Sequence, residues 1–563
     1  MIIRTVIIVA LSIYAAFLTM RHNMHMFQLN GYQNDEHVNW LKKNRRQQWL
    51  LYYGMILGLL KCLVFVIEVM LLQKVVQMSA PHLLSSQALA PQILTSQLET
   101  LLIVVNVICV VLDVLIILTL LLDILVYRAL RRLNTKKKLV YTPRVKRMVV
   151  TITVLSVVLV AMMCVLLGFG ALSGAALLIA SLQIFMNMAA NIINRPIEKS
   201  VNNYYINDAK RKLKSVPDLK IIGVTGSFGK TSVKFYLQTL LRAKYNVLVT
   251  PESYNTPMGI TKTIREYLKP THEIFVCEMG ARKVGEIKEV CDIAPPHHGV
   301  ITSVGPQHLD TFFSIENIKK TKFELADALP QGGILFLNGD NEYIQDKSRE
   351  YSNKIYYHSQ KAGSGYYAKD ISVSQFGTEF TVVTPSGEEE RFQMKLVGLH
   401  NVINVVGAIA VANTLEIALK DLKIPVRRIK PIPHRMEMKE HGNVTIIDDA
   451  FNSNPVGSKA AVETLALFDG IRILVTPGMV ELGEEEDEYN FKFGTYAAEC
   501  CDYILLVGRK HVEPIKNGVL SKGFPEEKCI VFNKVEEAIS YAYSIKGEGH
   551  KYILLENDLP DNY

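Results

Sequence analysis

The sequence lacks cysteine pairs at the spacings that bind metals or form redox centres. Its eight cysteines are scattered over 563 residues, and no Cys-x-x-Cys pair occurs among them. This distribution argues against a zinc-binding class and against a disulfide framework. We therefore expect the protein to work in a reducing compartment.

A basic excess spread over a folded domain is also missing, although the net charge is +8. The Lys and Arg residues concentrate in Arg128–Arg147, which holds nine, and in Arg195–Lys214, which holds six. Both stretches flank apolar segments. Basic residues in that position set membrane topology and attract anionic lipid, so the distribution argues against a nucleic-acid partner.

Leu, Val, Ile and Met dominate residues 1–194, whereas the rest of the chain has the mixed charge of a soluble protein. Because about 20 apolar residues cross a bilayer as a helix, this part of the sequence predicts five membrane helices. They cover residues 2–20, 49–72, 99–126, 149–167 and 173–193. The last two come from one apolar run that is too long for a single span, and Gly168, Gly170 and Gly174 mark its turn.

The basic loops predict how these helices are oriented. Loops 21–48 and 127–148 are rich in Lys and Arg, whereas loop 73–98 has only Lys74. The positive-inside rule then places the N-terminus outside and everything after Arg195 in the cytoplasm. The first helix lacks a convincing signal-peptide cleavage site, so we expect it to be retained. The sequence thus predicts a multi-pass protein of the cell membrane with cytoplasmic catalytic domains.

Four charged residues, Lys61, Glu68, Asp113 and Asp123, lie within or at the edges of the predicted spans. Charge inside a membrane is costly and often marks function, although snorkelling or pairing between helices explains it equally well. Asp113, near the middle of its span, is the strongest functional candidate of the four.

A glycine-rich turn follows a short apolar stretch at Lys220–Val224. Backbone amides in such a turn bind phosphates, Lys230 can reach the terminal phosphates, and the hydroxyl of Thr231 suits Mg²⁺. The generic phosphate-loop pattern requires glycine at position 224, where the sequence has valine. The variant Thr-Gly-Ser-x-Gly-Lys-Thr is present instead, over Thr225–Thr231.

This variant resembles the phosphate loop of the Mur ligases. Further motifs of that family follow in the family's order over residues 220–500. They are Pro251–Gly259, Glu273–Gly280, Val304–Asp310, Lys320–Leu325, Gly398–Asn404, His434–Glu437 and Asp448–Pro455.

The resemblance implies a role for each matched residue. ATP would be bound by Thr225, Gly226, Ser227, Gly229, Lys230, Thr231, Ser232, Asn401, Arg435 and Asp449. Mg²⁺ would be held by Thr231, Glu278 and His308, although imidazole is an unexpected ligand for a hard cation. Catalysis would depend on Lys230, Lys322 and His308, with Lys322 carbamylated, and the substrate would face Asn255, Asn452 and Asn454.

Several of these residues have an ordinary structural interpretation as well. Glu278 at a strand end can be a cap or a salt-bridge partner, His308 can be a loop histidine, and Asn401 can cap a helix. Lys322, beside Lys319 and Lys320, can lie on a solvated helix face.

Within the family, the likeness is closest to the ligases that add D-Ala-D-Ala, through Asp448–Pro455 and Gly478–Gly483. Two departures weaken that match. Gly478 stands where those ligases have an acid, and their soluble domain for the UDP-sugar is replaced here by apolar helices.

The expected architecture is a helical membrane domain over residues 1–195, a basic linker over 196–215, a central α/β ATP-binding domain over 216–430 and a C-terminal Rossmann-like α/β domain over 431–563. The alternating pattern of residues 365–396 predicts antiparallel strands inserted before the Gly398 helix.

The resemblance implies an ADP-forming ligase of cell-envelope synthesis. A carboxylate acceptor, peptidyl or lipid-linked, would be activated by ATP as an acyl phosphate, which an amino acid or dipeptide amine would then attack. Two alternatives remain open: a membrane-bound ligase of the polyglutamate type, and a non-catalytic nucleotide-binding scaffold. A scaffold would be expected to have lost Lys230, Glu278 or His308, and all three are present.

Overall fold

The computed structural model divides the chain into two compact units, with the boundary between Val201 and Asn202. It describes residues 2–43, 56, 58–61, 63–67, 69–71, 73–74, 92–131, 138–167, 171–360, 364–374, 376–451, 453–508 and 511–558. Each unit is built around its own core.

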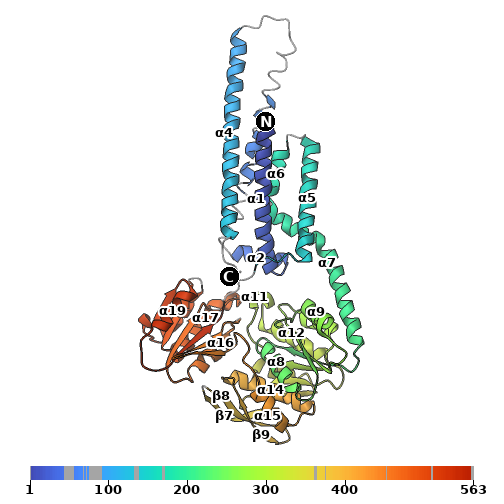
Figure 1. Cartoon of the computed structure of the whole chain (residues 1–563), viewed down its shortest axis with the longest axis vertical. Helices are drawn as coiled ribbons and strands as arrows, with labels where there is room; N and C mark the ends of the chain where they lie inside the picture. Colours follow the sequence, from blue (N-terminus) through green and yellow to red (C-terminus); the bar gives the residue numbers. More distant parts are fainter. Residues whose placement is uncertain are drawn as a thin grey trace. The chain divides into compact units, whose positions relative to one another are not determined.

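The first unit is helical (Figure 1). Its elements are α1 (Ile2–Leu29), α2 (Asn34–Lys43), α4 (Gln92–Arg131), α5 (Pro143–Leu167), α6 (Leu172–Ser181) and the beginning of α7 (Gln183–Lys214). Among the described residues, three helices are long and apolar enough to cross a membrane, over Ile3–Leu29, Ile103–Ala129 and Pro143–Leu166. The pair α6 and α7, bent by 77°, raises the number to four if it forms one broken span.

The predicted spans correspond to these helices to different degrees. Residues 2–20, 99–126 and 149–167 lie within α1, α4 and α5. Residues 173–193 fall on the bent pair, which is a broken span or a re-entrant loop with a 77° bend after Ser181. Within span 49–72, residues 56, 58–61, 63–67 and 69–71 are described and helical, and the others, Glu68 among them, lie outside the described residues. The count of five therefore stays a prediction.

Charged side chains inside this unit are paired. Lys61 contacts Asp123, and Arg4 lies 3.0 Å from Asp113. Farther along the chain, Arg147 of α5 donates to both carboxylate oxygens of Glu198 of α7, at 2.7 and 2.8 Å. Pairing lowers the free-energy cost of placing charge among apolar helices. Each of these contacts also joins two different helical segments.

The second unit begins with a nine-stranded sheet in the order β2-β3-β1-β4-β5-β6-β7-β8-β9. The parallel strands are β1 (Lys220–Thr225), β2 (Val247–Val249), β3 (Ile274–Glu278), β4 (His298–Ile301), β5 (Leu335–Asn338) and β6 (Lys354–His358). Their continuous buried runs are typical of strands that are covered on both faces. The strand order reverses at β1, so the loops after β1 and β4 meet where ligands bind in open parallel sheets.

Helices cover both faces of this sheet. One core cluster includes α8 (Lys230–Leu241), α14 (Leu399–Thr414) and α15 (Leu419–Arg427), and the other includes α9 (Pro257–Tyr267), α10 (Glu286–Ile293) and α12 (Ile315–Asp327). The short helices α11 (Leu309–Phe312) and α13 (Glu342–Ser348) complete this part.

The antiparallel insertion expected before the Gly398 helix is confirmed. β7 (Gly365–Ser374) pairs parallel to β6, and β8 (Gly377–Val383) and β9 (Glu389–Met394) then pair antiparallel. Alternating residues of β8 and β9, including Phe380 and Phe392, point into the core.

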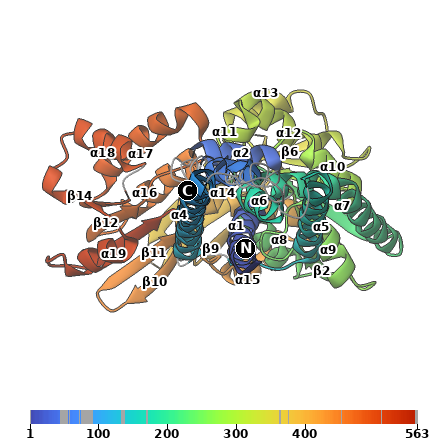
Figure 2. The ribbon, with the colours of Figure 1, turned by 90° about the horizontal axis from the view of Figure 1, so that it is seen from above.

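A separate six-stranded sheet follows, in the order β10-β11-β15-β12-β13-β14. Its strands are β10 (Glu437–His441), β11 (Val444–Asp449), β12 (Ile471–Thr476), β13 (Tyr503–Val507), β14 (Cys529–Phe532) and β15 (Lys551–Glu556). Only β10 is antiparallel. Figure 2 shows α17 (Glu486–Cys500) and α18 (Val512–Ser521) on one face and α19 (Val535–Ser544) on the other, while α16 (Pro455–Leu465) shares a core cluster with α17 and α18. The α/β fold class predicted from the sequence is confirmed.

The stretch predicted as a basic linker, 196–215, lies within α7 for almost its whole length. In the second unit, Ala209 of α7 is fully buried in a core cluster, and Asp208 accepts a hydrogen bond from Arg265 of α9 at 2.7 Å. The last turns of α7 therefore belong to the core of the second unit.

Candidate active site

The phosphate loop follows β1 and depends on glycine at position 226. Gly226 has φ 151°, and a Cβ there would lie 2.1 Å from Oγ1 of Thr302. The next two amides bind the loop after β4: the N–H of Ser227 donates to the Ser303 carbonyl at 2.9 Å, and that of Phe228 to Ser303 Oγ at 2.8 Å. The loops after β1 and β4 are thus held against each other.

Lys230 begins helix α8 and folds back over this loop. Its ammonium group donates to the carbonyl oxygens of Gly226 and Ser227, at 2.6 and 3.0 Å. Burial lowers the pKa of Lys230 to about 8. The first amides of α8 have no partner within the helix, and the helix dipole favours anions there, so the turn is suited to phosphate.

Glu278, at the carboxyl end of β3, is the centre of a buried polar network. Its Oε1 accepts hydrogen bonds from Thr231 at 3.0 Å and from Asn255 at 3.1 Å. Its Oε2 lies 3.0 Å from the ammonium group of Lys234. Burial alone would raise the pKa of Glu278, but the charges of Lys234 and Lys230 and these hydrogen bonds hold it below its ordinary value. The carboxylate is therefore ionised.

The residues around Glu278 fit Mg²⁺. Among the described residues, the buried Oε2 makes the charge contact with Lys234 but no hydrogen bond of ordinary geometry, so its acceptor capacity is not filled. Oxygen ligands from a carboxylate and a hydroxyl suit Mg²⁺, which keeps several waters and takes its other ligands from phosphates. No group of three or more His, Cys, Asp or Glu within the described part forms a metal cage. Glu278 and Thr231 would therefore hold the metal together with a nucleotide.

His308 lies at the start of α11 with φ 53°. Its side chain is 15% exposed, the loss of solvent around the ring lowers its pKa, and Nδ1 pairs with the carboxylate of Glu481 from the C-terminal domain. Its assignment as a metal ligand stays a prediction.

Lys322 lies on the buried face of α12 and is only 2% exposed, so it is not on the solvated face of its helix. Its ammonium group is 5.6 Å from the centre of the Phe312 ring. Burial, followed by the nearby charge of Lys230, lowers the pKa of Lys322 to about 7. By contrast, Lys319 pairs at the surface with Glu316 and Asp346.

Near its start, helix α14 carries two asparagines, the predicted base contact Asn401 and also Asn404. The amide of Asn401 is occupied, because its Oδ1 accepts from Tyr236 at 2.8 Å and its Nδ2 donates to the Val397 carbonyl at 2.8 Å. Its contact with the base stays a prediction. Asn404 lies closer to the loop: a Cβ added to Gly229 would be 2.9 Å from its Oδ1.

The C-terminal domain contributes Arg435 and Asp449. The guanidinium group of Arg435 is 3.5 Å from Thr231 Oγ1 and stacks over the Phe451 ring at 4.6 Å. Asp449, at the end of β11, accepts the Met436 N–H at 3.1 Å, and burial raises its pKa to about 6. Arg435 thus reaches the phosphate loop from the C-terminal domain.

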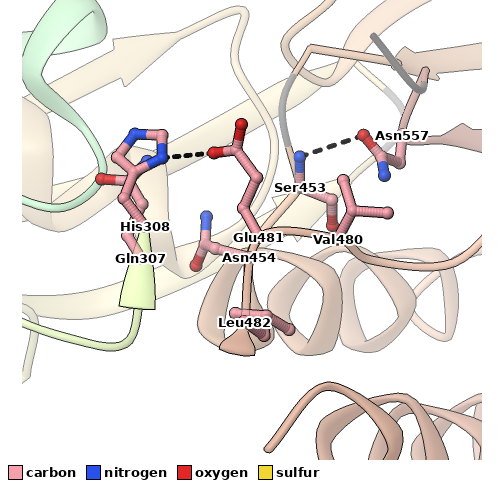
Figure 3. Close-up of a pocket in the computed structure, with 8 residues that line it drawn as sticks. All are labelled: Gln307, His308, Ser453, Asn454, Val480, Glu481, Leu482 and Asn557. Atoms are coloured by element: carbon pink, nitrogen blue, oxygen red, sulfur yellow. Dashed lines mark hydrogen bonds and ion pairs between the residues drawn. The ribbon is translucent and has the colours of Figure 1, made fainter. Parts of the chain in front are cut away.

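A pocket opens between the two domains of this unit (Figure 3). Asn454 lines it and caps α16 by accepting the Gly457 N–H at 2.9 Å. Asn452 lies outside the described residues. The complete lining is Gln307, His308, Ser453, Asn454, Val480, Glu481, Leu482 and Asn557.

Comparisons with known proteins agree with this geometry. Residues 224–412 match the Mur ligase middle domain, and residues 434–555 match the Mur ligase, glutamate ligase domain. The UDP-N-acetylmuramoyl-tripeptide–D-alanyl-D-alanine ligase of Escherichia coli is 30% identical over 59% of this chain and 75% of its own length. The chain belongs to the Mur ligase family.

Other relatives support the assignment. The ligase of the same name from Bacillus subtilis is 33% identical, over 49% of this chain and 59% of its own length. MurF from Acinetobacter baumannii shares the fold, with a TM-score of 0.59 at 23% identity over 64% of this chain and 78% of that one. MurF ligase from Thermotoga maritima, solved in complex with ADP, has a TM-score of 0.57 at 25% identity over 63% and 80%. This Mur ligase is accordingly an ATP-dependent, ADP-forming enzyme that uses Mg²⁺.

Three buried groups of the site were missed by sequence reasoning. Lys234 is one helical turn after Lys230, a spacing that places both on one face of α8. Glu481 belongs to the Gly478–Gly483 element, which carried a family likeness but no assigned role. Glu556 ends β15, where burial raises its pKa to about 7 and Thr476 donates to it at 2.7 Å. For Glu556, the signal that could have been used is its position as an acidic residue at the end of a strand.

Proposed function

We propose that this Mur ligase joins a cell-envelope carboxylate to the amine of D-Ala-D-Ala. The acceptor carboxylate attacks the γ-phosphorus of ATP, which forms an acyl phosphate and releases ADP. The amine then attacks the acyl carbon, loses a proton and expels inorganic phosphate. The D-Ala-D-Ala assignment is supported by the relatives' names and by the matched elements Asp448–Pro455 and Gly478–Gly483.

The observation that carries the proposal is the convergence of Lys230, Glu278 and Arg435 at Thr231. The two contacts of Thr231, 3.0 Å to Glu278 and 3.5 Å to Arg435, join the central and C-terminal domains around the phosphate loop. Positioning and electrostatic stabilisation dominate phosphoryl transfer, so cations on both sides of the phosphates offset the developing charge. Bound Mg²⁺ would add charge neutralisation at the phosphate oxygens.

The remaining residues would bind and orient the reactants. Gly226, Ser227, Gly229 and Ser232 would contact the phosphates, Asn401 the base, and Asp449 the ribose. Asn255, already bonded to Glu278, would lie beside the acceptor, and Asn452 and Asn454 would face the amine.

Lys322 has the properties that carbamylation requires. A carbamate forms when a neutral amine attacks CO₂, and a pKa of about 7 leaves a large neutral fraction at physiological pH. The product is an anion, which the nearby positive charge of Lys230 would stabilise.

We further propose that the acceptor is taken from the membrane. The apolar helices α1, α4 and α5 precede the ligase domains, and the basic stretches Arg128–Arg147 and Arg195–Lys214 favour an anionic membrane surface. An acceptor confined beside the active site reaches a high effective concentration without a dedicated binding domain. This makes the protein a multi-pass membrane ligase with cytoplasmic catalytic domains.

A ligation assay tests both parts of the proposal. Detergent-solubilised full-length protein and a variant starting at Asn202 are given MgATP, D-Ala-D-Ala and either a UDP-linked or a lipid-linked peptide acceptor. The truncation begins at Asn202 because Ala209 belongs to the soluble core. We expect the full-length protein to prefer the lipid-linked acceptor. Equal efficiency of both proteins on the UDP-linked peptide contradicts the membrane acceptor, and no ligation with either contradicts the function.

A further inference from the structure

Glu481 of the C-terminal domain is contacted by two residues of the central domain. Its Oε2 pairs with Nδ1 of His308, and its Oε1 lies 3.3 Å from Nη2 of Arg282. Figure 3 shows the imidazole and the carboxylate facing each other from the two sides of the pocket. The loop after β4 and the segment after β12 therefore meet at this one carboxylate.

Both members of the pair have unusual backbones. His308 has φ 53° and Glu481 has φ 66°, in the left-handed region that non-glycine residues rarely adopt. Such conformations persist where the surrounding structure enforces them, and they concentrate at functional contacts. Two facing residues that both adopt this conformation make the contact a candidate for a functional one.

The contact determines which nitrogen of His308 is available. A carboxylate accepts hydrogen bonds, so in the neutral ring Nδ1 carries the proton and Nε2 keeps its lone pair. Metal-binding histidines commonly donate their second N–H to a carboxylate, which fixes the tautomer and the orientation of the ring. Here the histidine belongs to one domain and the carboxylate to the other.

We propose that Glu481 is a positioning residue that prepares His308 for the nucleotide-bound metal. By accepting a hydrogen bond from Nδ1–H, it leaves Nε2 available as a ligand only while the C-terminal domain contacts the central domain. Arg282 holds the other carboxylate oxygen. Correct seating of the C-terminal domain is thereby linked to metal binding, an inference that rests on the proposed function.

Mn²⁺ provides a spectroscopic probe of this link. Binding of Mn²⁺ to the full-length protein in the presence of ADP is followed by electron paramagnetic resonance. Loss of a carboxylate behind a metal-binding histidine commonly weakens metal affinity about 10–100-fold. We expect Glu481→Gln to weaken Mn²⁺ binding by at least about tenfold, and to have no further effect in a His308→Ala background, because the two residues act in series.

Glu463→Gln is the matched control. Glu463 is in the same domain, but its partner Lys459 is 3.6 Å away and the Glu463 side chain is 57% exposed. This variant should bind Mn²⁺ like the wild type. If Glu481→Gln also does so, or if its effect adds to that of His308→Ala, Glu481 is a simple domain contact and the inference is wrong.

One further measurement and one further variant keep the outcomes separable. Thermal unfolding reports whether Glu481→Gln is folded, and Glu481→Asp, whose residue type tolerates the left-handed backbone, provides a second variant with a shorter reach. Lack of Mn²⁺·ADP binding by the wild type would contradict the proposed function itself. Wild-type binding with unchanged affinity in the folded Glu481 variants would contradict only the role of Glu481.

Discussion

The two units use buried charge in different arrangements. In the helical unit, opposite charges form separate pairs, Arg4 with Asp113 and Arg147 with Glu198, each joining one helix to another. In the ligase unit, which is the second unit, three cations surround the carboxylate of Glu278: Lys230, Lys234 and Arg435. Pairs neutralise their members locally, whereas a cluster with an excess of cations retains a field that a polyanion can use. The convergence of several cations on one carboxylate, more than burial, therefore distinguishes an active site from a structural ion pair.

The largest effect is expected where the cluster faces the phosphates. Lys230→Ala should lower turnover by at least about 10³-fold, because a cation that offsets charge in phosphoryl transfer commonly contributes that much. In the described part of the chain its ammonium group donates hydrogen bonds to loop carbonyls alone, so the second unit should still fold. The measurement is ATP-dependent ligation together with circular dichroism. A folded variant that still ligates would show that this cluster is not the catalytic one.

A second prediction concerns Lys234, which is fully buried between Glu278 and the Glu252 carbonyl. Lys234→Met keeps the aliphatic volume but leaves Glu278 without its closest cation. Breaking a buried ion pair on one side destabilises a protein by about 3–5 kcal/mol, so we expect a lower melting temperature and weaker nucleotide binding. Because Mg²⁺ can replace the missing charge, saturating MgADP should recover part of the stability. A variant as stable as the wild type would place Lys234 outside the cluster.

The cluster was predictable only in part from the sequence. The phosphate loop and Glu278 follow from local patterns, because a glycine turn and an acid each come directly after a parallel strand. Lys234 and Glu481 were missed because their partners, Glu278 and His308, are 44 and 173 residues away along the chain. The occupied amide of Asn401 depends on Tyr236 of another helix. The bend at Ser181 is likewise a tertiary feature, because no proline or charge marks it in the apolar run.

A third prediction uses the pKa of Lys322. A folded-state pKa of about 7 means that the amine is mostly neutral above pH 7 and mostly protonated below it. Since only the neutral amine reacts with CO₂, ligation should fall as the pH is lowered through 7 and should respond to added bicarbonate near that pH. Lys322→Ala should lose most activity and regain part of it with short-chain carboxylates that occupy the vacated space. Lys319→Ala is the matched control, because its pairs are on the surface.

The smallest catalytic effect is expected when a charge pair of the helical unit is broken. Arg147 donates to both oxygens of Glu198, whose side chain is only 10% exposed, so Arg147→Ala leaves a carboxylate without its strongest partner. Arg147 itself is 32% exposed. Solvent screening therefore limits the expected loss of unfolding free energy to about 1–3 kcal/mol. We expect faster thermal unfolding of the full-length protein in detergent and unchanged affinity for MgADP. Arg211→Ala is the control, because that arginine is 70% exposed in its pair with Asp208 and should change neither property. If Arg147→Ala weakens MgADP binding as much as it weakens the helical unit, the two units share one energetic network, and charge pairs in the helices are part of the site.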